Sequence, residues 1–205
     1  GVDMTIITDE ILENLRSNGV VVYPTSTLPG LGCLPNKRAL DNLYSLKKRP
    51  ADQPVSLGVE SLEQARLLVK TPKIAQDILQ EFPKGSLTLI LDANEPLDLR
   101  LGGDRVAVRV LSDERALKLV GKIGPITATS ANHSGVEPHY DTVSAGHELG
   151  LNNDCIVEGT CPGGAPSTIL SIEKSRHESS GYTVSIMREG VIPRIDVETW
   201  MRNYH

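Results

Sequence analysis

Residues 19–27 read Gly19-Val20-Val21-Val22-Tyr23-Pro24-Thr25-Ser26-Thr27, and this stretch decides the fold. Three valines and a tyrosine in a row predict a buried strand, which Pro24 ends. Hydroxyl side chains follow at the carboxyl end of that strand, where α/β sheets usually bind their ligands. A plain turn held by hydroxyl-to-backbone hydrogen bonds accounts for the same residues equally well. The stretch therefore predicts an α/β protein and marks one candidate binding loop.

Helix and strand patterns alternate on both sides of this strand. The first expected helix has Ile11, Leu12 and Leu15 on its apolar face and ends near Gly19. A second is capped by Asn36, and further helices are expected at 61–69, 71–82, 113–120 and 192–204. The expected strands are 55–59, 87–91, 106–110, 126–129, 156–157, 168–172 and 183–187. This mixture predicts a single α/β domain over residues 5–205, with one large twisted mixed β-sheet flanked by helices.

Composition excludes several classes of protein. The 205 residues carry a net charge of −5 and only seven aromatic side chains, too few for an RNA binder that stacks bases on aromatic platforms. Three cysteines without Cys-x-x-Cys spacing argue against a disulfide framework or zinc site and predict buried free thiols in a reducing cytoplasm. No apolar run approaches the length of a membrane span, and Gly1–Met4 lack the basic and apolar regions of a signal peptide. We therefore expect Gly1–Asp3 to be a remnant before a native Met4.

Two polar clusters interrupt the apolar pattern. Lys47-Lys48-Arg49 closes a predicted helix, where three cations suit a polyphosphate or simply complement the helix dipole. Residues 127–135, Thr-Ala-Thr-Ser-Ala-Asn-His-Ser-Gly, convert a β-branched strand into a loop of small hydroxyl and amide side chains. Such a loop admits a ligand closely, although a glycine turn capped by Asn132 has the same composition.

Two arginines mark a further candidate site. Arg105 and Arg109 are four residues apart on one predicted strand, so they share a face of the sheet. Charges on a mostly apolar strand need solvent, a salt bridge or an anionic ligand. Ser167 enters a later strand and Arg188 leaves another. The sequence contains no phosphate-binding loop of the P-loop type, no metal-ligand spacing and no Gly-x-Ser-x-Gly elbow.

Taken in order, these clusters resemble the YrdC-like threonylcarbamoyl-adenylate synthase family in its short, single-domain form. The resemblance covers roughly residues 10–192 and rests most on the paired Lys47/Arg49 and Ser130/Asn132 signatures. It implies a YrdC/RibB-like fold and a nucleotidyltransferase that combines L-threonine, bicarbonate and ATP into threonylcarbamoyl-adenylate, with release of pyrophosphate. A partner transferase complex would then modify tRNA, and this protein would bind nucleic acid weakly or not at all.

The resemblance also implies roles for single residues. Lys47 and Arg49 would be the catalytic residues and would face the ATP phosphates, with Mg²⁺ arriving with ATP and no metal ligand supplied by the protein. The threonine and bicarbonate site would comprise Thr25, Arg109, Ser130 and Ser167. Asn132 and Arg188 would contact the nucleotide.

The sequence departs from the family pattern at several positions. Ser26 stands where an acid is usual, Pro29 where an aromatic residue is usual, Gly58 where many members have His, and Arg105 where a small hydroxyl residue is common. Two other functions fit the same clusters. One is a module of the same fold that binds structured RNA through its cations. The other is a related carbamoyl-adenylate chemistry, as in the similar domain of hydrogenase maturation proteins.

Overall fold

Nine strands form two sheets in the computed structural model, which describes residues 6–205. The predicted domain boundary at residue 5 and the expected remnant Gly1–Asp3 lie outside the described residues. The smaller sheet has the order β1-β2-β7, with β1 Val21–Tyr23, β2 Gly30–Gly32 and β7 Thr129–Ser130. The larger sheet has the order β6-β3-β5-β4-β8-β9, with β3 Leu57–Val59, β4 Leu87–Asp92, β5 Arg105–Val110, β6 Ile126–Thr127, β8 Thr168–Lys174 and β9 Tyr182–Arg188.

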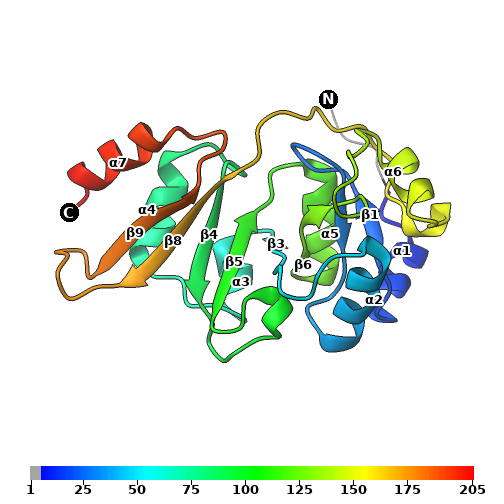
Figure 1. Ribbon diagram of the computed structural model, residues 1–205, viewed down its shortest axis with the longest axis horizontal. Coiled ribbons are helices and arrows are strands. Elements are labelled where there is room, and N and C mark those ends of the chain that lie inside the picture. The colour runs from blue at the N-terminus through cyan, green and yellow to red at the C-terminus, as the bar shows by residue number, and fades with distance from the viewer. Residues whose placement is uncertain (1–5) are drawn as a thin grey trace.

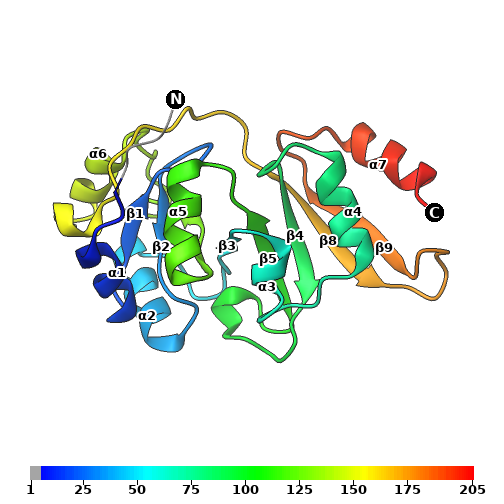
Figure 2. The ribbon, with the colours of Figure 1, turned by 180° about the vertical axis from the view of Figure 1, so that it is seen from behind.

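The larger sheet is mixed, as the sequence predicts. Strand β3 runs parallel to β5 and β4 runs parallel to β8, whereas the other neighbours are antiparallel. The helices are α1 Asp9–Arg16, α2 Lys37–Lys47, α3 Leu62–Ala65, α4 Lys73–Glu81, α5 Glu114–Ile123, α6 Thr142–Glu148 and α7 Arg194–Asn203. Helices α3 and α4 cover one face of the larger sheet, while α1, α2 and α6 gather around the smaller sheet (Figures 1 and 2).

Local side-chain chemistry sets several helix ends. The Asn36 side chain accepts a hydrogen bond from the backbone N–H of Ala39 and begins α2, as its position predicts. The same helix ends at Lys48, whose φ of 55° places it in the left-handed region. Asp113 begins α5 in the same way by accepting from Arg115 and Ala116. These caps fix where α2 begins and ends and where α5 begins.

The predicted strand 126–129 divides between the two sheets. Ile126 and Thr127 pair with β3 in the larger sheet, and Thr129 with Ser130 pairs with β2 in the smaller one. Ala128 lies between them, and its N–H donates to the carbonyl of Ser56 at 2.9 Å. This stretch therefore connects the two sheets, of which the sequence predicts only the larger.

Three other expectations need correction. The helix predicted for 61–69 ends at Ala65, because the chain beyond it pairs with the end of β4, where the N–H of Lys70 donates to Asp92. Ile156 and Val157 form only an isolated bridge to Val22 rather than a strand. Cys155 is partly exposed, although Cys33 and Cys161 are buried as free thiols.

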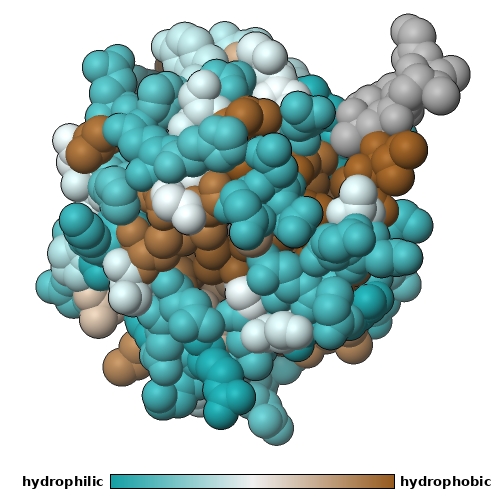
Figure 3. Space-filling view, turned by 90° about the vertical axis from the view of Figure 1, so that its right-hand side faces the viewer, coloured by the Kyte–Doolittle hydropathy of each residue, from teal (hydrophilic) through white to brown (hydrophobic). Residues whose placement is uncertain are grey.

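One face of the larger sheet forms the main core. Leu89, Leu91 and Val106 are buried there in one cluster with Ile74 and Ile78 of α4. Between residues 6 and 205, no helix combines the length and apolarity needed to cross a bilayer. Figure 3 views the outer face over α1, α2 and α6, where hydrophilic side chains surround an apolar area that extends across the middle of the view. The opposite face of the larger sheet is turned toward the smaller sheet, and the candidate site lies there.

Candidate functional site

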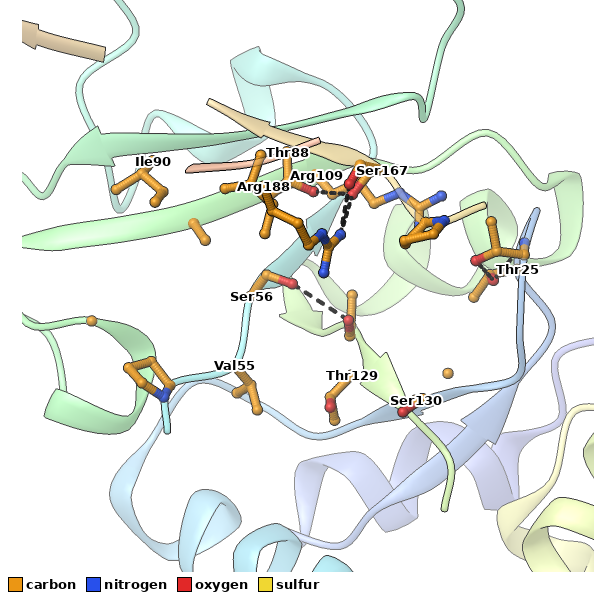
Figure 4. A pocket seen from close by; sticks show the side chains of 18 of the residues that line it. Thr25, Val55, Ser56, Thr88, Ile90, Arg109, Thr129, Ser130, Ser167 and Arg188 are labelled. Atoms are coloured by element: carbon orange, nitrogen blue, oxygen red, sulfur yellow. Dashed lines mark hydrogen bonds between the residues drawn. The ribbon is translucent and has the colours of Figure 1, made fainter. Parts of the chain in front are cut away.

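A cavity of about 650 Å³ lies between the two sheets. Its lining comes from the β1–β2 loop, the approach to β3, one face of the larger sheet and the segment between β6 and β7: Thr25, Thr27–Gly30, Arg49, Pro54–Ser56, Thr88, Ile90, Leu101, Gly102, Arg105, Ala107, Arg109, Ala128–Ser130, Pro166, Ser167, Ile169 and Arg188. This volume is in the usual range for small-molecule sites. Figure 4 shows Thr25 and Ser167 toward one end, Val55 and Ile90 toward the other, and Arg188 between them.

The floor of the cavity follows from strand alternation. Arg105, Ala107 and Arg109 of β5 all line the cavity, which confirms that the two arginines share one face. Thr88 and Ile90 of β4 lie on the same face, since Thr88 pairs with Arg109 in the sheet register. Thr88 was not predicted as a site residue. Its signal in the sequence is a hydroxyl at one alternate position of an otherwise apolar strand.

Arg109 lies where the sheet meets the β1–β2 loop. Its Nε donates to the carbonyl of Gly85 at 2.9 Å, and its Nη2 donates to Ser26 Oγ at 3.0 Å. Burial, together with the nearby charge of Arg188, lowers the pKa of Arg109, although the group stays protonated at any physiological pH. Arg109 is therefore a partly desolvated cation whose two contacts are neutral oxygens, a state that favours an anionic ligand.

Arg188 and Ser167 form a second polar group on the floor. The Nη2 of Arg188 donates to the Ser167 carbonyl at 2.6 Å, and the hydroxyls of Ser167 and Thr88 are 2.7 Å apart. In Figure 4 the Arg188 guanidinium points into the cavity. Ser167 is thus held by two neighbours, and Arg188 presents the rest of its guanidinium to a ligand.

Arg105 is held differently. Its Nη1 donates to Asp92 Oδ1 and to the carbonyl of Ile172, both at 2.8 Å, and its Nη2 donates to Ser171 Oγ at 2.6 Å and to the carbonyl of Ile90 at 3.2 Å. These contacts bind β4, β5 and β8 together. Of the two alternatives left open for the arginine pair, a salt bridge holds for Arg105, whereas Arg109 has no carboxylate partner among the described residues.

Lys47 is buried behind the cavity wall, with 2% of its surface exposed. Its Nζ donates to the carbonyls of Ser130 and Asn132 at 2.6 and 2.9 Å and to Asn132 Oδ1 at 3.1 Å. Ser130 lines the cavity, but Lys47 and Asn132 do not. The structure therefore brings the two signature pairs together, with Lys47 holding the Ser130–Asn132 segment from behind. A contact from Lys47 or Asn132 to a nucleotide stays a prediction.

Arg49 and Thr25 complete the predicted set, and both line the cavity. Arg49 donates from Nε to the carbonyl of Gln53 and from Nη2 to the carbonyl of Pro54, each at 2.8 Å, and so shapes the approach to β3. Thr25 is buried, and its hydroxyl donates to the carbonyl of Leu28 at 2.6 Å. The β1–β2 loop is therefore a turn held by hydroxyl hydrogen bonds, and it also forms a wall of the cavity.

The charge of the lining is one-sided. Four arginines line the cavity, one of them (Arg105) paired with Asp92, and among its described lining residues there is no aspartate or glutamate. The described chain also contains no group of three or more histidine, cysteine or acidic side chains placed to hold a metal. Hydroxyls and guanidinium groups alone are poor ligands for Mg²⁺, which in proteins is usually bound through a carboxylate and substrate phosphates. The cavity is thus suited to an anionic ligand, and the absence of a metal ligand from the protein stays a prediction.

Comparison with known proteins identifies the family. The Sua5/YciO/YrdC family profile, described as "Telomere recombination", matches residues 13–190. The chain belongs to the Sua5/YciO/YrdC family. The matched range contains every predicted site residue, from Thr25 to Arg188.

Relatives in the Sua5/YciO/YrdC family carry one recurrent name. A threonylcarbamoyl-AMP synthase of Pyrococcus abyssi is 31% identical over 189 residues, which cover 90% of this chain and 54% of the relative. One of Idiomarina loihiensis is 34% identical over 171 residues, covering 79% of this chain and 91% of the relative. The chain therefore spans about half of one relative and nearly all of the other.

A solved structure carries the same likeness. The crystal structure of Pyrococcus abyssi Sua5 complexed with L-threonine superposes with a TM-score of 0.78 at 30% identity, covering 92% of this chain and 55% of that one. The fold predicted from the sequence is confirmed by this match.

Proposed function

We propose that the chain is an ATP-dependent nucleotidyltransferase that forms threonylcarbamoyl-adenylate from L-threonine, bicarbonate and ATP. The observation that carries the proposal is the cavity lined by four arginines and no described acid. Support comes from the relatives named threonylcarbamoyl-AMP synthase and from the similar structure solved with L-threonine.

The two ends of the cavity suit the two organic substrates. Thr25, Ser167 and Arg109 lie toward one end, where Arg109 would bind the amino-acid carboxylate through a paired guanidinium contact. Val55, Ile90 and other apolar side chains line the other end, which suits a purine ring. The phosphates would then lie between them, near Arg188.

The reaction needs no nucleophilic side chain. The amine of L-threonine attacks the carbon of bicarbonate to give a carbamate and water. A carbamate oxygen then bonds to the α-phosphorus of ATP as the bond to the β-phosphate oxygen breaks, and pyrophosphate leaves. Negative charge gathers on the transferring phosphate and on pyrophosphate, and fixed guanidinium groups stabilise such charge without reorganising. Mg²⁺ would enter as part of the ATP substrate, bound to its phosphate oxygens.

The family signatures take separate roles in this proposal. Arg49 borders the cavity and would face the phosphates. Lys47 would act through the Ser130–Asn132 segment, which its Nζ holds in place. Holding three reactants in a productive geometry is itself worth roughly 7–11 kcal/mol in favourable intramolecular cases, so a residue that fixes the wall has a large effect without touching a reacting atom.

Pyrophosphate release is the deciding assay. The purified chain with Mg²⁺ and ATP should release pyrophosphate only when both L-threonine and bicarbonate are present. Release that is unchanged when threonine is omitted would refute the proposal. Carbamoyl phosphate in place of threonine and bicarbonate tests the related carbamoyl-adenylate chemistry.

The partners and location belong to the same proposal. A downstream transferase complex would move the threonylcarbamoyl group to tRNA, and the three free thiols suit the reducing cytoplasm. The arginines surround a cavity instead of lining a ridge, which favours a nucleotide over an RNA strand. RNA affinity that falls steeply with salt would instead support the RNA-binding alternative.

A further inference from the structure

An amino acid brings two charged groups to this cavity, and the described lining offers an oppositely charged side chain to only one of them. Arg109 can bind the carboxylate, because its Nη1 makes no hydrogen bond within residues 6–205. An ammonium group needs a carboxylate or several well-placed oxygens. The described lining offers hydroxyl and backbone oxygens for it, but no carboxylate to balance its charge, and guanidinium groups lie nearby.

The unbalanced charges nearest this end of the cavity are cations. Arg188 faces Arg109 from β9, and Arg49 faces the cavity from the end of α2. Tyr23 of β1 lies beside Arg109, and burial raises the pKa of the Tyr23 phenol, so this side chain stays uncharged. Lys47 lies behind Ser130 and adds a further cation. Arg105, farther along β5, is neutralised by Asp92.

Ser26 is the position that sets this balance. Its Oγ is 3.0 Å from Arg109 Nη2, at the point where the β1–β2 loop meets the sheet. A carboxylate at position 26 would pair with Arg109 and remove one unit of positive charge from this end of the cavity. A serine accepts the same hydrogen bond and leaves the guanidinium charge unbalanced.

We propose that Ser26 makes this site select an amino-acid substrate whose amine is uncharged, either as the free amine or as its carbamate. The inference rests on the proposed function and adds to it the ionic form of the substrate and the residue that selects it. A protonated amine is repelled, whereas the neutral amine has the lone pair that attack on bicarbonate requires. Charge at position 26 therefore acts on substrate binding and readiness for reaction together.

Two ligands and two variants test this selection. The ligands are L-threonine and the 2-hydroxy acid in which a hydroxyl replaces its amine, and their affinities are measured by titration calorimetry at fixed ionic strength. At pH 7 the wild-type chain should bind the hydroxy acid at least as tightly as L-threonine. Ser26→Asp should shift the affinity ratio toward L-threonine by about tenfold, the effect of one pKa unit on the bound amine. Ser26→Asn, which has the same shape without the charge, should leave the ratio unchanged.

The wild-type protein provides a second measurement that depends on no variant. Affinity for L-threonine should rise by up to about tenfold per pH unit as the pH approaches the amine pKa, because binding then releases a proton. Affinity for the hydroxy acid should show no such rise, and this control removes any change that comes from Lys47.

Several results would overturn the inference. These are tighter binding of L-threonine than of the hydroxy acid by the wild-type chain at pH 7, an equal pH response for both ligands, and the same shift from Ser26→Asn as from Ser26→Asp. Pyrophosphate release distinguishes failure of the amine selection from failure of the proposed function. Threonine-dependent release together with one of these results refutes the selection alone, whereas absence of threonine-dependent release refutes the proposed function and the inference with it.

Discussion

Lys47 allows a direct measurement of the free-energy cost of burying a charged side chain in this fold. Its Nζ contacts oxygens of Ser130 and Asn132, and no carboxylate is among the partners. Burial, with a smaller effect from Arg49, lowers the pKa of Lys47 from 10.5 to about 8. Lys47→Met keeps a long side chain at this position and removes the charge. We expect this variant to lose the rise in stability with pH that titration of Lys47 causes.

The sign and size of this effect follow from proton linkage. Between pH 8 and 10.5 the unfolded chain binds more protons at this lysine than the folded chain, so its contribution to the free energy of unfolding rises with pH. Over the whole range from below pH 8 to above pH 10.5, this contribution changes by about 3 kcal/mol. Between pH 7 and pH 9 the wild-type protein gains roughly 1 kcal/mol of it. The loss of stability caused by Lys47→Met should therefore be larger at pH 9 than at pH 7 by that amount.

Urea denaturation of both proteins at pH 7, 8 and 9 measures the difference. The Cys33 thiol, whose pKa burial raises to about 12, contributes the opposite trend above pH 9, but it is present in both proteins and cancels. Carbon-13 NMR of the lysine ε position in the wild-type protein gives the pKa directly, even if the variant folds poorly. A Lys47 titration at pH 10 or above, or a stability difference that does not change with pH, would refute the reasoning.

Three further predictions use neighbouring features. Arg49→Ala should lower kcat/KM about 10- to 100-fold, which is the size expected for a lost charge-assisted contact. Lys48 is exposed, so Lys48→Ala should leave pyrophosphate release nearly unchanged. Equal losses in the two variants would contradict a role for Arg49 in the cavity. Lys48→Gly should raise the free energy of unfolding by about 0.5–1 kcal/mol, because φ is 55° there, and thermal melting that shows a loss would contradict this. Thr127→Val should lower the free energy of unfolding, measured by urea denaturation, by about 1–3 kcal/mol. The reason is that the Thr127 hydroxyl accepts from the N–H of Cys33 and donates to the carbonyl of Leu31 in the core. Thr127→Ser is the matched control and should retain most of the stability.

Features with a local cause were predictable from the sequence. The Asn36 cap depends on a side chain and a backbone group three residues apart, and the shared face of Arg105 and Arg109 depends only on strand alternation. The β1–β2 loop was identified because hydroxyls follow a buried strand. In each case the physical interaction lies within a few residues of the chain.

Features set by distant contacts were not predictable. Strand β2 reads Gly30-Leu31-Gly32 and has a single side chain from which to read a pattern, so the smaller sheet was missed. The burial of Lys47 depends on carbonyls more than eighty residues away, which no local pattern contains. A lysine at a helix end is ordinarily solvated, and only the assembled site shows that this one faces inward.

The division of 126–130 between two sheets has a consequence for how the protein unfolds. Because Ala128 is the sole residue between β6 and β7, neither sheet can slip by one residue without reversing the side chains of the other. The two walls of the cavity therefore share one register. A ligand bound between them should protect amide hydrogens of both sheets from exchange together, so that the site and the whole domain open as one cooperative unit.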